Sequence, residues 1–189
     1  MTVETAPGFF LTAAALILLL EPGELGALAC AAAVHELGHL MAILAAGCTP
    51  ARLRLGLGGF SIDYLGGGYL ADMLIALAGP AAGVLGALCA GPGGAALFAG
   101  ISLALSAFNL LPVRELDGGQ ALRALLCLML GPDRGELWAR AVSLGVLGLV
   151  TAAALMHPLL LPVLLPLWVG EITECLQTGG ICCRINKKG

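Results

Sequence analysis

The chain has 189 residues, of which 59% are hydrophobic and only 11% are charged, whereas soluble domains carry roughly 25% charged residues. Together with a mean hydropathy of +0.99, this composition excludes a soluble globular protein and indicates an integral membrane protein. The net charge is -3, so the overall basic character typical of nucleic-acid-binding proteins is missing and we expect no nucleic-acid partner. At roughly 20 residues per crossing, about six helices fit into a single domain over residues 1–189.

Apolar segments separated by glycine, proline or charged residues predict the membrane helices. They are Phe9–Leu20, Leu25–Ala46, Leu70–Ala90, Ala95–Leu130, Leu137–Met156 and Leu159–Leu176. The fourth segment is interrupted at Pro112–Gly119, and a bilayer tolerates irregular backbone only where protein buries it or it lines a cavity. We therefore expect an all-α polytopic membrane protein with about six transmembrane helices, the fourth of them broken at a functional site.

The distribution of lysine and arginine predicts the orientation. If the amino terminus is cytoplasmic and the fourth segment crosses once, all nine basic residues lie on the cytoplasmic side. The positive-inside rule then favours both termini in the cytoplasm, for a multi-pass protein of the bacterial cytoplasmic membrane. If the broken segment crosses twice instead, the carboxyl terminus lies outside.

The stretch between residues 49 and 69 has the alternation of a β-hairpin. Its apolar positions are Leu53, Leu55 and Leu57, followed by Phe60, Ile62 and Tyr64. A two-residue turn at Gly58 and Gly59 would pair Leu57 with Phe60 and place Arg54 opposite Asp63. We expect a short membrane-associated hairpin with its apolar face towards the bilayer.

The second predicted helix contains His35, Glu36 and His39 in an H-E-x-x-H pattern. Residues four apart differ by about 40° around a helix, so both imidazoles project from one face and can bind one zinc ion. Glu36 is then the candidate general base for the attacking water. Three polar side chains in an apolar membrane helix need compensation, and a metal site compensates all three together.

Zinc needs a third protein ligand. The extended metalloprotease pattern would place this ligand at position 45, which is alanine. Asp117 is the best candidate, because it follows Pro112 in the broken fourth segment and lies near the depth of His39. The other carboxylates and imidazoles considered are Asp63, expected to pair with Arg54, His157, expected on the far side, and Glu171 and Glu174, expected to be interfacial charges.

The sequence resembles the site-2 proteases, which are intramembrane zinc metalloproteases. The resemblance rests on His35–His39 as HELGH, on Ala78–Pro80 as AGP, and on Asn109, Pro112 and Leu116–Gly118 as N-x-x-P-x-x-x-L-D-G. It implies that one Zn²⁺ per chain is bound by His35, His39 and Asp117, that Glu36 activates water, and that Asn109 holds the substrate carbonyl or its oxyanion. The family often has Asn at the position of Gly83, so a polar contact expected there is missing.

The resemblance implies cleavage of a membrane-anchored protein. It is strongest to the branch that includes stage IV sporulation protein FB, which suggests sigma-factor precursor processing in sporulation. We expect neither a PDZ insertion nor a regulatory nucleotide-binding module, and an inhibitory membrane partner stays open. The hairpin residues Leu55, Gly58, Gly59 and Ile62 are expected to bind unwound substrate as an added strand, with a simple connector as the alternative.

Two other functions remain compatible with the residues. Broken helices and intramembrane charges also occur in transporters and membrane scaffolds, which would not need Glu36. A membrane zinc hydrolase acting on a lipid or small molecule would use the same metal and base. Only a substrate assay separates the hydrolase from the protease.

Overall fold

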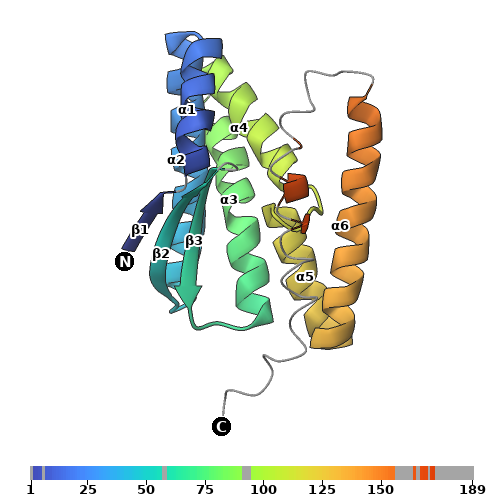
Figure 1. Cartoon of the computed structure of the whole chain (residues 1–189). Coiled ribbons are helices and arrows are strands. Elements are labelled where there is room, and N and C mark those ends of the chain that lie inside the picture. The colour runs from blue at the N-terminus through green and yellow to red at the C-terminus, as the bar shows by residue number, and fades with distance from the viewer. Residues whose placement is uncertain are drawn as a thin grey trace.

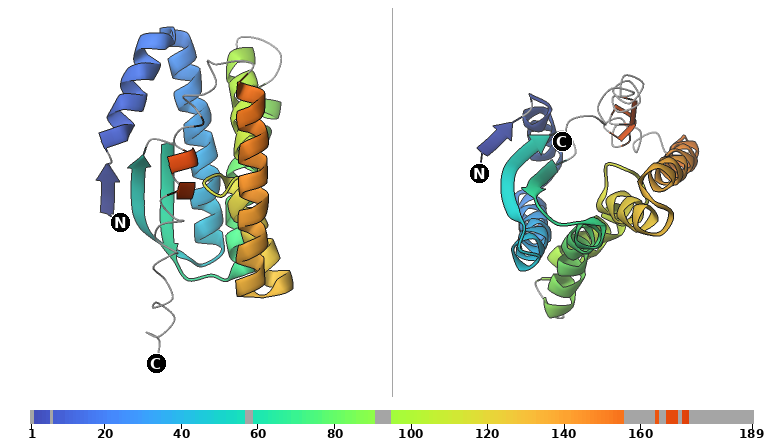
Figure 2. Two further views of the ribbon diagram at one scale, coloured as in Figure 1. Left: turned by 45° about the vertical axis from the view of Figure 1, so that its right-hand side comes forward. Right: turned by 90° about the horizontal axis from the view of Figure 1, so that it is seen from below.

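The protein is a mostly helical membrane protein with one small sheet (Figure 1). Its structure is a computed structural model that describes residues 2–5, 7–56, 59–90, 95–155, 164, 167–169 and 171–172. The elements are β1 Thr2–Thr5, α1 Pro7–Leu19, α2 Pro22–Ala45, β2 Thr49–Gly56, β3 Gly59–Leu65, α3 Tyr69–Cys89, α4 Ala96–Asn109, α5 Asp117–Leu130 and α6 Pro132–Ala154. The helices stand side by side, and the sheet lies along one side of the bundle (Figure 2).

Three of the described helices, α2, α3 and α6, are long and apolar enough to cross a membrane. Helices α4 and α5 have 14 residues each, and α5 continues beneath α4 while α6 runs beside both (Figure 1). The predicted break in the fourth segment is confirmed, although it covers residues 110–116 and not Pro112–Gly119. The count of six crossings and the orientation of the termini stay predictions.

Helix α2 begins with a sequence that favours a helix start. Pro22 occupies the first helical turn, and the Glu24 side chain accepts a hydrogen bond from the Glu21 amide at 3.0 Å. Its middle packs tightly on α3, because a Cβ on Gly38 would lie 2.6 Å from both the Ala78 carbonyl oxygen and the Ala82 Cβ. Glycine at position 38 therefore sets the close approach of the two helices.

The break between α4 and α5 is partly buried and contains its own backbone hydrogen bonds. The amides of Val113 and Leu116 donate to carbonyls within the loop at 2.8 Å, and both side chains belong to the apolar core. Gly118 and Gly119 lie in the first turn of α5, where a Cβ would come within 2.2 Å and 2.0 Å of loop carbonyl oxygens. The two glycines thus allow the loop to fold back on α5.

The hairpin is present, but its predicted register is wrong by two residues. Gly56 pairs with Gly59, Leu53 with Ile62 and Arg52 with Asp63, so Arg54 does not face Asp63. Residues 57 and 58, which connect the two strands, lie outside the described residues. A two-residue shift keeps the same side chains on each face, so the apolar alternation alone cannot distinguish the two registers.

Two further features of the sheet differ from the prediction. Strand β1, which the sequence analysis did not predict, pairs parallel with β2, so β2 is the central strand and Leu55 lies between Thr5 and Phe60. The side chains of Ile62 and Tyr64 pack on an apolar cluster of α2, the following turn and α3, formed by Ile43, Cys48 and Ile75. This part of the apolar face is therefore partly buried against protein.

The described residues of the predicted sixth helix, Leu159–Leu176, are helical and lie along α6. Leu164 and Leu167 join Leu147 and Ala154 in one core cluster, and Trp168 Nε1 donates a hydrogen bond to Thr151 Oγ1 at 2.9 Å. The remaining residues of this segment, His157 and the basic tail lie outside the described residues.

Candidate metal centre

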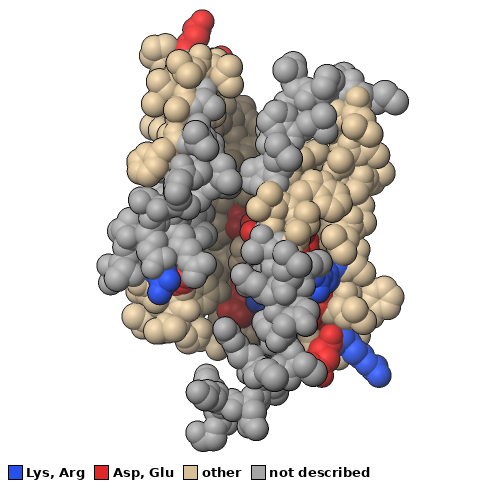
Figure 3. Space-filling view, viewed as in Figure 1, with Lys and Arg blue, Asp and Glu red and all other residues tan. Residues whose placement is uncertain are grey.

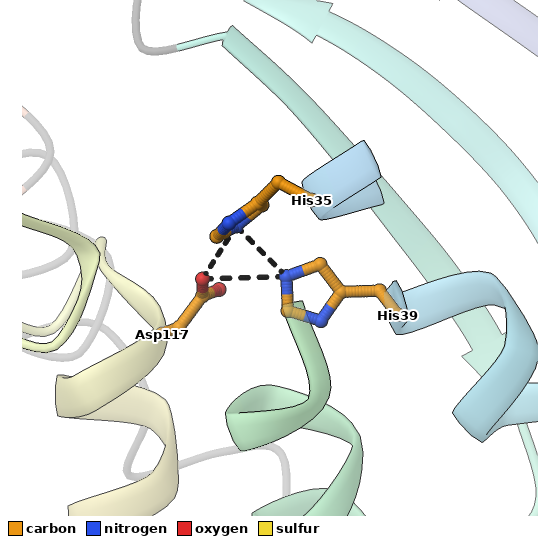
Figure 4. Close-up of side chains that lie close together, drawn as sticks. All are labelled: His35, His39 and Asp117. Atoms are coloured by element: carbon orange, nitrogen blue, oxygen red, sulfur yellow. Dashed lines mark hydrogen bonds and ion pairs between the residues drawn. The ribbon is translucent and has the colours of Figure 1, made fainter. Parts of the chain in front are cut away.

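His35, His39 and Asp117 converge in the interior of the bundle (Figure 4). Asp117 Oδ2 lies 2.9 Å from His35 Nε2 and 3.3 Å from His39 Nε2, and the two Nε2 atoms are 3.2 Å apart. His35 is buried, and the side chains of His39 and Asp117 are 12% and 15% exposed. The structure therefore brings together the two predicted histidines and the carboxylate chosen from the broken segment.

The position of His39 is set by α3. His39 Nδ1 donates a hydrogen bond to the Ile75 carbonyl at 2.8 Å, which in a neutral ring leaves Nε2 as the acceptor that faces Asp117. A Cβ on Gly79 would lie 2.1 Å from His39 Nε2, so only glycine fits beside the imidazole. Pro80 follows directly and weakens this turn of α3, because it has no amide hydrogen to donate.

Asp117 is the first residue of α5. The amino-terminal end of a helix carries a partial positive charge, which stabilises a carboxylate at this position. The loop before Asp117 packs against the first turn of α5, where Gly118 and Gly119 leave room for it. Asp117 thus reaches the histidines because the fourth segment is broken at their level.

The donor set fits a zinc ion. A tetrahedral site with bonds of about 2.0–2.1 Å has ligand atoms about 3.3–3.4 Å apart, and the three observed separations of 2.9, 3.2 and 3.3 Å lie close to this value. Three acceptor atoms this close repel one another unless a proton or a cation lies between them. Three protein ligands also leave the fourth position free, as in catalytic zinc sites.

The other two predicted catalytic residues lie on α2 and at the end of α4. Glu36 is half-buried and interacts electrostatically with both histidines and with Asp117. Asn109 is the last residue of α4, and its Nδ2 donates to the Leu105 carbonyl at 3.0 Å, which leaves the second hydrogen of that amide for another acceptor. Their roles in a reaction stay predictions.

The remaining candidates lie elsewhere or outside the described residues. Asp63 lies on β3 opposite Arg52. Glu171 is not an interfacial charge, because it is only 1% exposed and accepts a hydrogen bond from Ser143 Oγ. His157 and Glu174 lie outside the described residues, as does the hairpin residue Gly58, whereas Leu55, Gly59 and Ile62 lie in β2 and β3.

Sequence reasoning missed the contribution of α3 to this centre. The only signal was the Ala78–Pro80 element, noted for its resemblance and without a structural role. The missing polar residue at Gly83 is also explained, because a Cβ there would lie 2.3 Å from Ser106 Oγ. Glycine at 83 therefore makes room for a buried serine of α4.

The space-filling view places acidic side chains deep between the α1–α2 side and the α6 side, where the surface is hollowed (Figure 3). The outer surfaces of the helices carry many exposed apolar side chains, among them Leu18, Leu88, Met129 and Leu149. The polar centre is therefore surrounded by surfaces suited to lipid.

The sequence matches no protein-family model and no curated protein sequence. Among solved structures, the chain is similar to a site-2 protease from Methanocaldococcus jannaschii, with 22% sequence identity and a TM-score of 0.69. The similarity covers 91% of this chain and 89% of the other. The protein therefore shares the fold of a site-2 protease.

Proposed function

We propose that this protein is an intramembrane zinc metalloendopeptidase that cleaves a membrane-anchored protein. The observation that carries the proposal is the triangle of His35 Nε2, His39 Nε2 and Asp117 Oδ2, whose sides of 2.9 to 3.3 Å suit one zinc ion, next to the carboxylate of Glu36. A shared fold with a site-2 protease and the membrane helices support the same reaction at membrane depth.

Zinc held by these three residues would polarise the scissile carbonyl and favour loss of a proton from the attacking water. Glu36 accepts this proton and returns it to the nitrogen of the leaving amine, as a general base and then a general acid. Asn109 donates its free amide hydrogen to the substrate carbonyl, whose oxygen gains negative charge during attack. The chain thus supplies the metal ligands, the proton carrier and a donor for the oxyanion.

The free edge of β3 is the proposed binding site for unwound substrate. A transmembrane helix must lose its internal hydrogen bonds before a protease can attack it, and those groups need new partners in the membrane. Among the described residues β1 covers the outer edge of β2, which leaves an edge of β3 available. Ile62 of β3 packs against the apolar cluster that includes Ile75, whose carbonyl accepts the hydrogen bond from His39, so this strand lies near the helices that carry the metal ligands.

Proline substitutions test this edge. Neighbouring residues of an edge strand direct their amides alternately towards the paired strand and away from it, so of Ser61→Pro and Ile62→Pro one removes only an outward amide. That variant should retain zinc and lose most cleavage, whereas Leu55→Val should be nearly silent. If both proline variants cleave at the native rate, the hairpin is only a connector.

Co-expression tests the function as a whole. The native chain and its Glu36→Gln variant should each be produced with candidate membrane-tethered regulators from the same genome, including sigma-factor precursors, which would be the substrates of a sporulation role. We expect a cleaved product only with the native chain, because glutamine cannot accept the proton. Equal function of the Glu36→Gln variant would instead indicate a non-enzymatic membrane protein, and hydrolysis of lipid alone would indicate a different hydrolase.

A further inference from the structure

Glu171 is a buried carboxylate for which the proposed reaction has no use. It is 1% exposed and follows Leu164 and Leu167, which belong to an apolar cluster together with Val113. A carboxylate in such surroundings is costly unless a hydrogen bond compensates it. Its Oε1 accepts a hydrogen bond from Ser143 Oγ, whereas Oε2 has no partner among the described residues.

The segment that contains Glu171 packs along α6, with one helical face of the segment against one face of α6. Described residues 164, 167, 168 and 171 are spaced as one face of a helix, and so are residues 143, 147, 151 and 154 of α6. Glu171 contacts Ser143, and Trp168, about one turn before Glu171, contacts Thr151, about two turns after Ser143. The two faces therefore run antiparallel, and Glu171 is fixed opposite Ser143.

Ser143 links Glu171 to the loop before Asp117 by hydrogen bonds. Its Oγ accepts a hydrogen bond from the Arg114 amide at 2.9 Å, while its single hydroxyl hydrogen goes to Glu171. The guanidinium of Arg114 also pairs with Glu136 of α6 at 2.6 Å. Arg114 lies three residues before Asp117, so these two contacts help to hold the loop that presents this carboxylate.

The orientation of the Ser143 hydroxyl depends on Glu171. In a helix, a serine hydroxyl otherwise tends to donate to the carbonyl four residues earlier, which in α6 is Ala139. The carboxylate draws the hydrogen away from α6 and thereby directs an oxygen lone pair towards the Arg114 amide. These two hydrogen bonds run in one direction, because the Arg114 amide donates to Ser143 and the Ser143 hydroxyl donates to Glu171.

We infer that Glu171, acting through Ser143, is a positioning residue that fixes the Arg114 loop and so places the carboxylate of Asp117 opposite the two histidines. The inference rests on the proposed zinc site. His35 and His39 share one helix, whereas Asp117 comes from elsewhere in the chain, so its position depends on how this loop is held. Partners that orient metal ligands in this way typically change metal affinity by about 10- to 100-fold.

Metal affinity in the full-length protein tests the inference without any substrate. We would titrate purified, metal-free protein with Co²⁺ alone and record the dissociation constant and the absorption spectrum of the bound ion. Ser143→Ala and Glu171→Leu should each weaken binding by about 10- to 100-fold and alter the spectrum. Glu171→Gln should stay near native, because its amide oxygen can still accept the serine hydrogen. The double variant Ser143→Ala/Glu171→Leu should be no weaker than the worse single variant.

Trp168→Phe is the matched control. It removes the hydrogen bond to Thr151 in the same segment but leaves the contact with Arg114 intact, so it should lower thermal stability and leave Co²⁺ affinity unchanged. Amide hydrogen exchange of metal-free protein adds a second readout, since the peptide containing Arg114 should exchange faster in Ser143→Ala and at the native rate in Trp168→Phe.

Native Co²⁺ affinity and spectrum in Ser143→Ala would overturn the inference, and so would equal losses in Ser143→Ala and Trp168→Phe. Failure of the protease proposal has a different signature: the native chain would bind the metal, and the variants would behave as expected, but no membrane-anchored protein would be cleaved.

Discussion

Two of the candidate metal-ligating side chains come from one regular helix, and the third comes from a helix end that neighbouring elements hold in place. The four-residue spacing of His35 and His39 on α2 fixes their relative position through the geometry of the helix itself. Asp117 is the first residue of α5. Its position depends on the loop at 110–116, on the hydrogen bond of that loop to Ser143 of α6, and on Gly118 and Gly119. The comparison indicates that the local fold determines the histidine pair, whereas tertiary packing completes the centre.

Removing a ligand from either side should have the largest effect. Zinc should co-purify with the native protein at about one equivalent, and His39→Ala and Asp117→Ala should both lose it, because three protein ligands and an open position make up a catalytic site. Elemental analysis of the purified protein measures this loss. Glu36→Gln is the control and should retain zinc. Full metal content and activity in Asp117→Ala would show that the third ligand lies elsewhere.

A methyl group on α3 should show how far the histidine pair depends on its neighbours. In Gly79→Ala the new Cβ would lie 2.1 Å from His39 Nε2, so the imidazole must move away from the metal position, and zinc affinity should fall by roughly 10- to 100-fold. Gly145→Ala on α6 is the matched control, because its Cβ would have nothing within 4 Å. Equal affinities in competition with a chelator would show that α2 places His39 unaided.

The sequence predicted the parts of this centre that depend on local spacing. His35 and His39 follow from helical periodicity, and Asp117 follows from a break at the depth of His39. The role of Gly79 could not be predicted, because it depends on which side chain of α2 lies against α3. The register of the hairpin was missed for a related reason, since a shift by two residues preserves the alternation and only the strand pairing in the structure distinguishes the alternatives.

Strand β1 was missed because its pairing is entirely non-local. It has four residues, and its partners on β2 are about fifty residues away in the chain, from Thr2 opposite Arg52 to Thr5 opposite Leu55. A parallel pair of this kind has no connecting turn that a sequence pattern could indicate. The central position of β2, and with it the location of the free edge on β3, therefore required the structure.

Cross-linking should distinguish the two hairpin registers. Leu53 and Ile62 are directly opposite in the structure, where Cβ atoms approach closely enough for a disulfide after modest adjustment. A protein carrying Leu53→Cys and Ile62→Cys should form this bond on oxidation, detectable by mass spectrometry of its peptides. The pair Leu55→Cys and Ile62→Cys, which the earlier register would align, is the control. Preferential cross-linking of that control pair would restore the predicted register.

The smallest effect should come from the single hydrogen bond that ties the hairpin to the start of α3. Tyr64 Oη donates to Asp72 Oδ1 at 2.8 Å, and Tyr64→Phe should lower the free energy of unfolding by at most about 1 kcal/mol because the pair is only partly buried. Burial and the neighbouring Asp72 carboxylate raise the pKa of Tyr64 above its ordinary value. A raised pKa in the folded state means that this stabilisation is fully present below the ordinary tyrosine pKa of about 10 and is lost as the pH rises through the folded value. Denaturant titrations of both proteins in detergent should therefore differ at pH 7 and converge at strongly alkaline pH, whereas zinc content should be the same in both. A difference that grows with pH would mean that Asp72 does not accept the hydrogen bond.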